Sequence, residues 1–232
     1  MSRLHRRATR IDSQLLREVA NIEPDANQRD EMAGPSYLHP IPFVRWLFWK
    51  RLDIVVRCLM GRPGPHASGL DFGCGLGVML PTLSAISRRV YATDLVIAPA
   101  RRLAETLHLD NVEFVEPRDD DRHVARESLD YVISTDVLEH VDDLGEVVAR
   151  FQSWLKPGGH LIVSGPTENA IYKAGRVLAG FGGKGGYHHT DIHRIHGHIT
   201  RPGSGFVVVE QQVLPIRHLV EAFHIYSYRK LD

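Results

Sequence analysis

The chain has 232 residues, of which 43% are hydrophobic and 24% charged, a composition typical of one globular domain with a sizeable core. Its 28 lysines and arginines balance 28 aspartates and glutamates, and the pI near 7.3 gives no overall positive field, which argues against a nucleic-acid partner. The two cysteines, Cys58 and Cys74, form neither a disulfide framework nor a metal-ligand pattern, as expected in a reducing compartment.

The opening of the chain carries arginines but lacks the apolar core of a secretory signal. No uncharged run in the sequence is long enough to span a bilayer. These two observations predict a soluble, cytoplasmic protein.

Three parts are expected along the chain. Residues 1–35 form a polar N-terminal extension of doubtful order, with one short helical pattern through Leu15, Leu16 and Val19. Residues 36–65 form a helical lid and linker, in which a helix over 41–60 has Pro42 in its first turn and is stopped by "GRPGPHASG". Residues 66–232 form the main domain.

In the main domain, short apolar runs alternate with amphipathic helical patterns. The expected strands are "SGLDFG", "RVYATD", "NVEFVE", "LDYVIS" and "GHLIVSG", and the expected helices cover 76–87, 97–108 and 143–155. This alternation predicts an α/β fold built from parallel βαβ units with right-handed crossovers. The last two runs, "GFVVVEQQVL" and "HLVEAFHIYSY", are separated by a turn at Pro215 and should pair as an antiparallel hairpin at a sheet edge.

The segment "GLDFGCGLGVML" places Gly73, Gly75 and Gly77 between the first expected strand and a helix. Such a loop lets a ligand approach the bare backbone, and the following helix offers unpaired N–H groups. A dinucleotide fingerprint has its third glycine one residue later, so NAD is less favoured but stays open.

Two acidic residues flank this loop in the expected sheet. Asp71 precedes the glycines and favours a ligand that carries a cation, since a carboxylate would repel a pyrophosphate. Asp94 ends the second strand about twenty residues further on, where an acid can accept both hydroxyls of a ribose. An acid at the position of Asp94 is found in sites for NAD and in sites for other adenosine ligands, so it does not distinguish between them.

Four motifs in order, "DFGCGLG", "YATDL", "LDYVISTDVLEHVDD" and "WLKPGGHLIVSGP", resemble class I S-adenosylmethionine-dependent methyltransferases. The likeness covers roughly residues 66–230 and is closest to the small-molecule group that includes ubiquinone and menaquinone biosynthesis methyltransferases. It implies a Rossmann-like three-layer sandwich, with a mostly parallel seven-stranded sheet, an antiparallel C-terminal strand and helices on both faces. It also implies S-adenosyl-L-methionine as the cofactor.

The resemblance further implies roles for individual positions. Gly73, Cys74 and Gly75 would pass beneath the methionine part of the cofactor, and Asp71 would lie near its amino end. Asp94 would hold the ribose, with Leu95 beside the adenine. The expected cofactor-binding set is completed by Gly77, Asp119, Ser134 and Thr135. Asp119 is the least regular member, because "EPRDDD" places Arg118 where the family usually has an acid that meets the adenine amino group; Asp119 or Asp120 would replace it.

Glu139 and His140 follow the fourth strand at the carboxyl edge of the expected sheet, where open α/β sheets bind ligands. They are the candidate catalytic residues. A histidine titrates near neutral pH, which suits a general base, and a Glu-His pair at this place assists deprotonation in the similar plant alkaloid N-methyltransferases. The alternative is an architectural role, in which the pair packs the start of the next helix against the cofactor.

Two later segments invite a binding interpretation. In "YHHTDIHRIHGH", His189, His193 and His196 share a helical face and could ligate zinc, but Ile192, Ile195 and Ile199 line the neighbouring face. A packed helix is favoured, and no metal is expected. The run "FGGKGG" at 181–186 lacks a leading strand and is interpreted as a mobile flap.

The segment 43–57 interleaves tryptophans with basic residues, a composition also found where a helix lies in a membrane interface. Apolar residues occupy most of its circumference, so burial as a lid over the cofactor is favoured over peripheral membrane contact.

The sequence therefore predicts methyl transfer to oxygen, nitrogen or carbon of a small molecule. The alternatives are a non-catalytic binding or assembly protein with the same pocket, which only activity on a true acceptor would distinguish, and a less favoured NAD-linked reductase. Aromatic residues suggest an aromatic or lipophilic acceptor, namely Tyr37, Trp46, Trp49, Tyr172 and Tyr187. The acceptor itself and the oligomeric state are left open.

Overall fold

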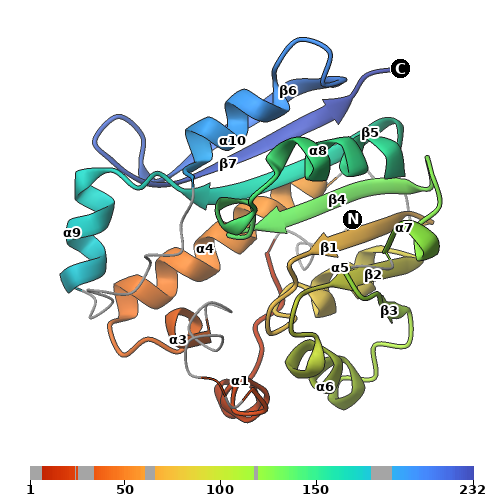
Figure 1. Ribbon diagram of the computed structural model, residues 1–232. Coiled ribbons are helices and arrows are strands. Elements are labelled where there is room, and N and C mark those ends of the chain that lie inside the picture. The colour runs from red at the N-terminus through yellow and green to blue at the C-terminus, as the bar shows by residue number, and fades with distance from the viewer. Residues whose placement is uncertain (1–6, 24, 26–33, 61–65, 118–119, 179–189) are drawn as a thin grey trace.

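The computed structural model describes residues 7–23, 25, 34–60, 66–117, 120–178 and 190–232. A seven-stranded sheet lies between two layers of helices (Figure 1). The strands are β1 (Ser68–Phe72), β2 (Arg89–Thr93), β3 (Val112–Phe114), β4 (Leu129–Thr135), β5 (Leu155–Pro166), β6 (Phe206–Ile216) and β7 (Val220–Lys230). The helices are α1 (Ser13–Ala20), α3 (Gly34–Tyr37), α4 (Pro42–Leu59), α5 (Leu80–Ile86), α6 (Ala98–Thr106), α7 (Asp120–His123), α8 (Leu144–Trp154), α9 (Ala170–Leu178) and α10 (Ile192–Ile199), with a 3₁₀ turn η2 (Leu138–His140).

The strand order β3-β2-β1-β4-β5-β7-β6 confirms the expected fold class. Strands β1 to β5 pair in parallel, and β7 runs antiparallel to both of its neighbours. The chain moves outward from β1 to β3 and then returns to the other side of β1 as β4. Because the order reverses between β1 and β4, their carboxyl ends border the crevice where open α/β sheets bind ligands.

Alternating residues of the central strands contribute side chains to two hydrophobic layers, one on each face of the sheet. Tyr131 and Ile133 of β4 face the layer that contains α4 and α5, whereas Val132 faces the layer that contains α8 and α10. All three side chains are fully buried. In Figure 1, α4 crosses behind the sheet and α8 lies in front of it. Both faces of β4 are therefore covered, as expected for a central parallel strand.

The elements predicted from the sequence pattern are present, with two differences. The helix after the glycines begins at Leu80, not at residue 76, because the Gly77 N–H donates to the Cys74 carbonyl (2.7 Å) in a turn with positive φ at Gly77. The β6–β7 hairpin forms at the sheet edge, but Pro215 lies within β6, opposite Glu221, and the chain turns at residues 217–219.

The N-terminal part packs against the same core. The predicted helix through Leu15, Leu16 and Val19 forms as α1, whose N-cap Asp12 accepts the Gln14 and Leu15 N–H groups. Its Leu16 and Val19 side chains are buried. This helix thus contributes to the core, while the order of the extension as a whole and the division of the chain at 35 and 65 stay predictions. Helix α4 begins at Pro42 as expected. Among the described residues, no helix has the length and apolarity needed to cross a membrane.

Candidate active site

The turn after β1 depends on glycine at three positions. Gly73, Gly75 and Gly77 have φ of +79°, +52° and +79°, which L side chains rarely adopt. The Gly73 N–H donates to the Thr93 carbonyl at the end of β2 (2.8 Å). A Cβ at Gly73 would overlap the Val137 side chain, which follows β4. The turn is therefore held tightly between the ends of β2 and β4.

Asp94 fastens this turn to the loop after β2. Its carboxylate accepts the Gly75 N–H (2.7 Å) through one oxygen and the Val96 N–H (3.1 Å) through the other. Burial raises the pKa of Asp94, while these backbone N–H groups act to lower it. Each carboxylate oxygen has a second lone-pair site, so the group can accept further hydrogen bonds from a ligand.

Asp71, near the end of β1, lies in a buried environment that disfavours the charged form of its carboxyl group. Its side chain is 2% exposed, and burial, together with repulsion by Asp94, raises its pKa to about 8. The buried thiol of Cys74 has its pKa raised by the same burial and by both carboxylates. A cation placed near Asp71 would relieve this electrostatic cost.

Buried hydroxyl groups lie near the carboxyl ends of three strands. The Oγ atoms of Ser134 on β4 and Ser164 on β5, and Oγ1 of Thr93 on β2, have no hydrogen-bond partner within the part of the chain that the structure describes. Thr135, the last residue of β4, is half-buried. Buried polar atoms are normally satisfied, so this grouping is typical of a site that receives a polar ligand.

Glu139 and His140 lie in η2, immediately beyond β4. Glu139 is 1% exposed, and its Oε2 lacks a hydrogen-bond partner among the described residues. Burial raises the pKa of Glu139 to about 7, against the opposing effects of its own backbone N–H and of Arg51. His140 is half-buried, and its N–H donates to the Val137 carbonyl (2.9 Å). A carboxylate whose pKa lies near neutrality can accept a proton at that pH.

Arg51 of α4 was missed by sequence reasoning. Its side chain is 1% exposed and forms an ion pair with Asp136, and its Nη2 donates a hydrogen bond to the Tyr37 hydroxyl oxygen (3.2 Å). The guanidinium carbon lies 4.9 Å from the Phe48 ring centre and 5.0 Å from that of Phe223. A buried arginine is costly unless it is paired, so an arginine within the apolar stretch of this helix was the signal available in the sequence.

Most of the predicted site residues thus lie together at the carboxyl edge of the sheet. The structure places Asp71, Gly73, Cys74, Gly75, Gly77, Asp94, Ser134 and Thr135 at the carboxyl ends of β1, β2 and β4 or in the turns that follow, and Glu139 and His140 beside them. Leu95 is 90% exposed next to Asp94. Asp119 lies outside the described residues. The contacts proposed for these residues stay predictions.

The predicted histidine helix forms as α10, with Ile192, Ile195 and Ile199 fully buried. His196 stacks on Tyr226 of β7 (ring centres 4.3 Å apart), and its Nδ1 lies 3.0 Å from the Tyr228 hydroxyl. Burial lowers the pKa of His196, and His193 and His224 lower it further. The described residues contain no group of three side chains arranged to hold a metal ion; His189 and the 181–186 segment lie outside them.

Comparison with known proteins identifies the family of the chain. The family model of the methyltransferase domain matches residues 8–226. The ubiquinone biosynthesis O-methyltransferase of Bradyrhizobium diazoefficiens is 34% identical over 109 residues, which are 43% of this chain and 40% of that protein. The same enzyme of Nitrobacter winogradskyi is 33% identical over 144 residues, 60% of this chain and 54% of that protein. The alignments span about half or less of these relatives.

Solved structures show the same fold. N-methyltransferase NodS from Bradyrhizobium japonicum WM9, in complex with S-adenosyl-L-homocysteine, superposes with a TM-score of 0.66 at 18% identity and covers 90% of this chain and 100% of its own. An S-adenosylmethionine-dependent methyltransferase from Mesorhizobium loti gives a TM-score of 0.58 at 21% identity, covering 77% and 97%. The chain belongs to the methyltransferase domain family, and its fold is that of the S-adenosylmethionine-dependent methyltransferases. The resemblance inferred from the four motifs is confirmed at this level.

Proposed function

We propose that this protein transfers a methyl group from S-adenosylmethionine to a hydroxyl oxygen of a small, aromatic or lipophilic molecule. The family match supports methyl transfer, and the curated relatives, named as O-methyltransferases, favour oxygen as the acceptor atom. The observation that carries the proposal is the pair of acids at the carboxyl ends of β1 and β2, the buried Asp71 and the half-buried Asp94, joined by a glycine turn.

These residues fit the proposed methyl donor in charge and in hydrogen-bonding capacity. When bound, S-adenosylmethionine supplies a methyl group activated as a sulfonium. Asp71, whose pKa is raised in the ligand-free protein, would meet the positively charged amino end of the methionine part. Asp94 would accept the ribose hydroxyls with the lone pairs that Gly75 and Val96 leave unused. The unpartnered Ser134 hydroxyl would find a partner in the same ligand.

Glu139 is the proposed general base. Its Oε2 would accept the acceptor's hydroxyl proton while the acceptor oxygen forms its bond to the methyl carbon and the carbon–sulfur bond breaks, with the bonding pair going to sulfur. A pKa of about 7 leaves much of Glu139 ionised at neutral pH yet basic enough to take a proton. His140 is half-buried beside it, and its proposed role is to position the turn.

Aromatic side chains beside Arg51 support an aromatic or lipophilic acceptor. Phe48 of α4 contacts Tyr37 and Phe223 edge-on, with ring centres 5.9 and 5.4 Å apart, and Tyr172 of α9 contacts Phe223 at 5.6 Å. The rings thus come from α3, α4, α9 and β7. Tyr37 and Phe223 are buried, whereas Phe48 and Tyr172 are half-buried, and rings of this kind suit a flat apolar ligand. The ring cluster adjoins the ion pair of Arg51 with Asp136.

Calorimetric titration with S-adenosylmethionine and with S-adenosylhomocysteine tests the cofactor, and Asp94→Ala is the matched variant. We expect saturable binding by the wild type and at least tenfold weaker binding by the variant, because the ribose contact and the anchor of Gly75 are lost together. Absence of binding by the wild type would refute the proposal.

Transfer is tested separately with methyl-labelled donor and phenolic acceptors, and then with cell extract. Labelled product that forms with the wild type but not with a Glu139→Gln variant supports the proposed enzymatic function. Donor binding without any labelled product would favour the non-catalytic alternative.

A further inference from the structure

Helix α4 presents different chemistry on its two sides. Arg51 and Val55 are buried on the side that faces the core. At 100° per residue, Pro42, Trp46 and Trp49 project on the other side. There they line a hollow of about 340 Å³, which we call the basic hollow; its walls are Arg7, Arg10, Pro42, Arg45, Trp46, Trp49, Lys50 and Asp53.

The basic hollow has a strong positive excess. It contains four cationic side chains and one carboxylate, Asp53. That carboxylate is already occupied, because it accepts the Ala8 N–H (3.0 Å) and two hydrogen bonds from Arg10 (2.9 Å each). Arg10 also lies over the Trp49 ring at 4.6 Å. The charges of Arg7, Arg45 and Lys50 therefore have no carboxylate partner among the residues that line the hollow.

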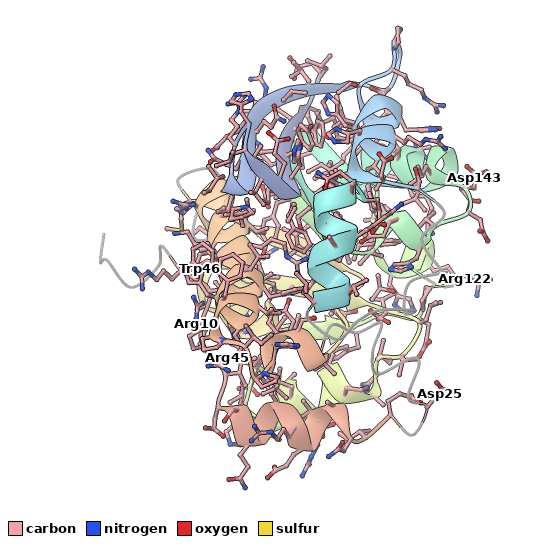
Figure 2. All side chains as sticks on the ribbon, turned by 90° about the vertical axis from the view of Figure 1, so that its left-hand side faces the viewer. Arg10, Asp25, Arg45, Trp46, Arg122 and Asp143 are labelled. Atoms are coloured by element: carbon pink, nitrogen blue, oxygen red, sulfur yellow. The ribbon has the colours of Figure 1, made fainter. Side chains whose placement is uncertain are left out.

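Exposed apolar side chains border the hollow at the start of α4. Ile41, Phe43 and Trp46 are 43%, 57% and 46% exposed, and Phe43 stacks on Trp46 with ring centres 5.6 Å apart. The Arg45 side chain is held at the start of α4 by hydrogen bonds from Nη1 to the His39 and Pro40 carbonyls. Figure 2 shows Arg10, Arg45 and Trp46 together on one flank of the molecule, with Asp25 and Asp143 on the opposite edge.

We propose that this flank is a docking surface for an anionic lipid bilayer. Phe43 and Trp46 would enter the interfacial region, where aromatic rings are favoured, while Arg7, Arg45 and Lys50 meet lipid phosphates. A bilayer fits better than a nucleic acid, because the protruding rings stack on each other and the chain as a whole carries no net charge. The proposal concerns a surface on the far side of α4 from Arg51 and does not depend on the identity of the methyl acceptor.

The test is co-sedimentation of the full chain with vesicles of phosphatidylcholine, with and without phosphatidylglycerol. We expect binding only to the anionic vesicles, weakened by salt. Arg7→Gln and Lys50→Gln should each weaken binding about fivefold, since a cation near an anionic surface contributes about 1 kcal/mol. Trp46→Ser should weaken it about tenfold or more, through loss of the inserted ring.

Matched controls lie elsewhere on the surface. Arg102 of α6 is 63% exposed at its side chain and Leu219 in the β6–β7 turn is 67% exposed, so Arg102→Gln and Leu219→Ser should leave vesicle binding unchanged. Circular dichroism and S-adenosylhomocysteine binding check that each variant is folded.

The proposal is overturned if anionic vesicles bind no protein at low salt, or if the control variants weaken binding as much as Lys50→Gln. It is equally overturned if millimolar inorganic phosphate abolishes vesicle binding, which would assign the hollow to a small free anion. Retained vesicle binding in phosphate, lost in the Trp46→Ser variant, supports the bilayer.

Discussion

The buried guanidinium of Arg51, on α4, forms an ion pair with Asp136, the residue that follows β4. Asp136 has φ of +57°, and its N–H donates to the Ser164 carbonyl (2.9 Å), so the backbone is held in a left-handed turn that directs the carboxylate toward α4. Arg51 also lowers the pKa of Glu139. One side chain of the N-terminal part thus connects α4 to the proposed reaction zone.

This pair makes a first prediction about stability. Arg51→Met should lower the free energy of unfolding by about 3 kcal/mol, because removal of one partner leaves a charge without compensation in a largely buried site. Asp136→Asn keeps a residue that tolerates positive φ. The double variant should recover part of the loss, since no unpaired charge remains. Urea unfolding of the wild type, the two single variants and the double variant measures the coupling free energy between the two side chains. Strictly additive changes in the free energy of unfolding would show that they do not interact.

A second prediction concerns protons released on binding of S-adenosylmethionine. With a pKa of about 8, Asp71 is mostly protonated in the ligand-free protein at pH 7. A bound cation favours the carboxylate and lowers that pKa, so binding should release up to one proton. Calorimetry at pH 7 in two buffers with different ionisation enthalpies measures the number released.

Asp71→Asn is the matched variant for this experiment, since it removes the titrating group and keeps its shape. It should bind the ligand more weakly and release close to no protons. Proton uptake by the wild type, or equal release by wild type and variant, would contradict the role given to Asp71.

The features of the sheet that the sequence predicted are those with local causes. The strands, the glycine turn and the acids Asp71 and Asp94 could be located from residue type and spacing. A parallel strand and the ligand-binding turn that follows it are specified by a few consecutive residues. The late start of α5 was not predicted, since it depends on a turn hydrogen bond between Gly77 and Cys74.

The features that the sequence did not predict depend on contacts between residues that are distant along the chain. Arg51 and Asp136 are separated by 85 positions in the sequence numbering, and no periodicity reports that they meet. The buried state of Glu139, which raises its pKa, likewise results from packing against β5 and the start of α10. For the candidate catalytic pair, the sequence suggested His140 as a general base from its usual pKa, with an architectural role as the alternative. The proposal of Glu139 as the base depends instead on its burial, which the sequence pattern did not predict.

A third prediction compares two glycines with nearly equal positive φ. Gly73 and Gly158 have φ of +79° and +75°, but a Cβ would overlap Val137 at Gly73 and would meet nothing within 4 Å at Gly158. Gly158→Ala should therefore cost only the left-handed conformation, about 1 kcal/mol. Gly73→Ala should cost about 3 kcal/mol, since overpacking adds to that strain, and should also weaken S-adenosylhomocysteine binding. Urea unfolding and calorimetry check both effects, and equal costs at the two positions would mean that Val137 yields freely.

The last prediction concerns the pH dependence of methyl transfer. A general base must be deprotonated to act, so kcat/KM should rise with pH through about 7, the pKa of Glu139, and level off above it. Glu139→Gln should lower kcat by about 10²–10⁴-fold and remove this rise, while S-adenosylhomocysteine affinity is preserved because the cofactor residues are untouched. Arg51→Met should move the rise to higher pH, because Arg51 acts to lower the pKa of Glu139. His140→Gln is the matched control, and we expect it to keep the rise near pH 7; if it removes the rise while Glu139→Gln retains it, the base is His140.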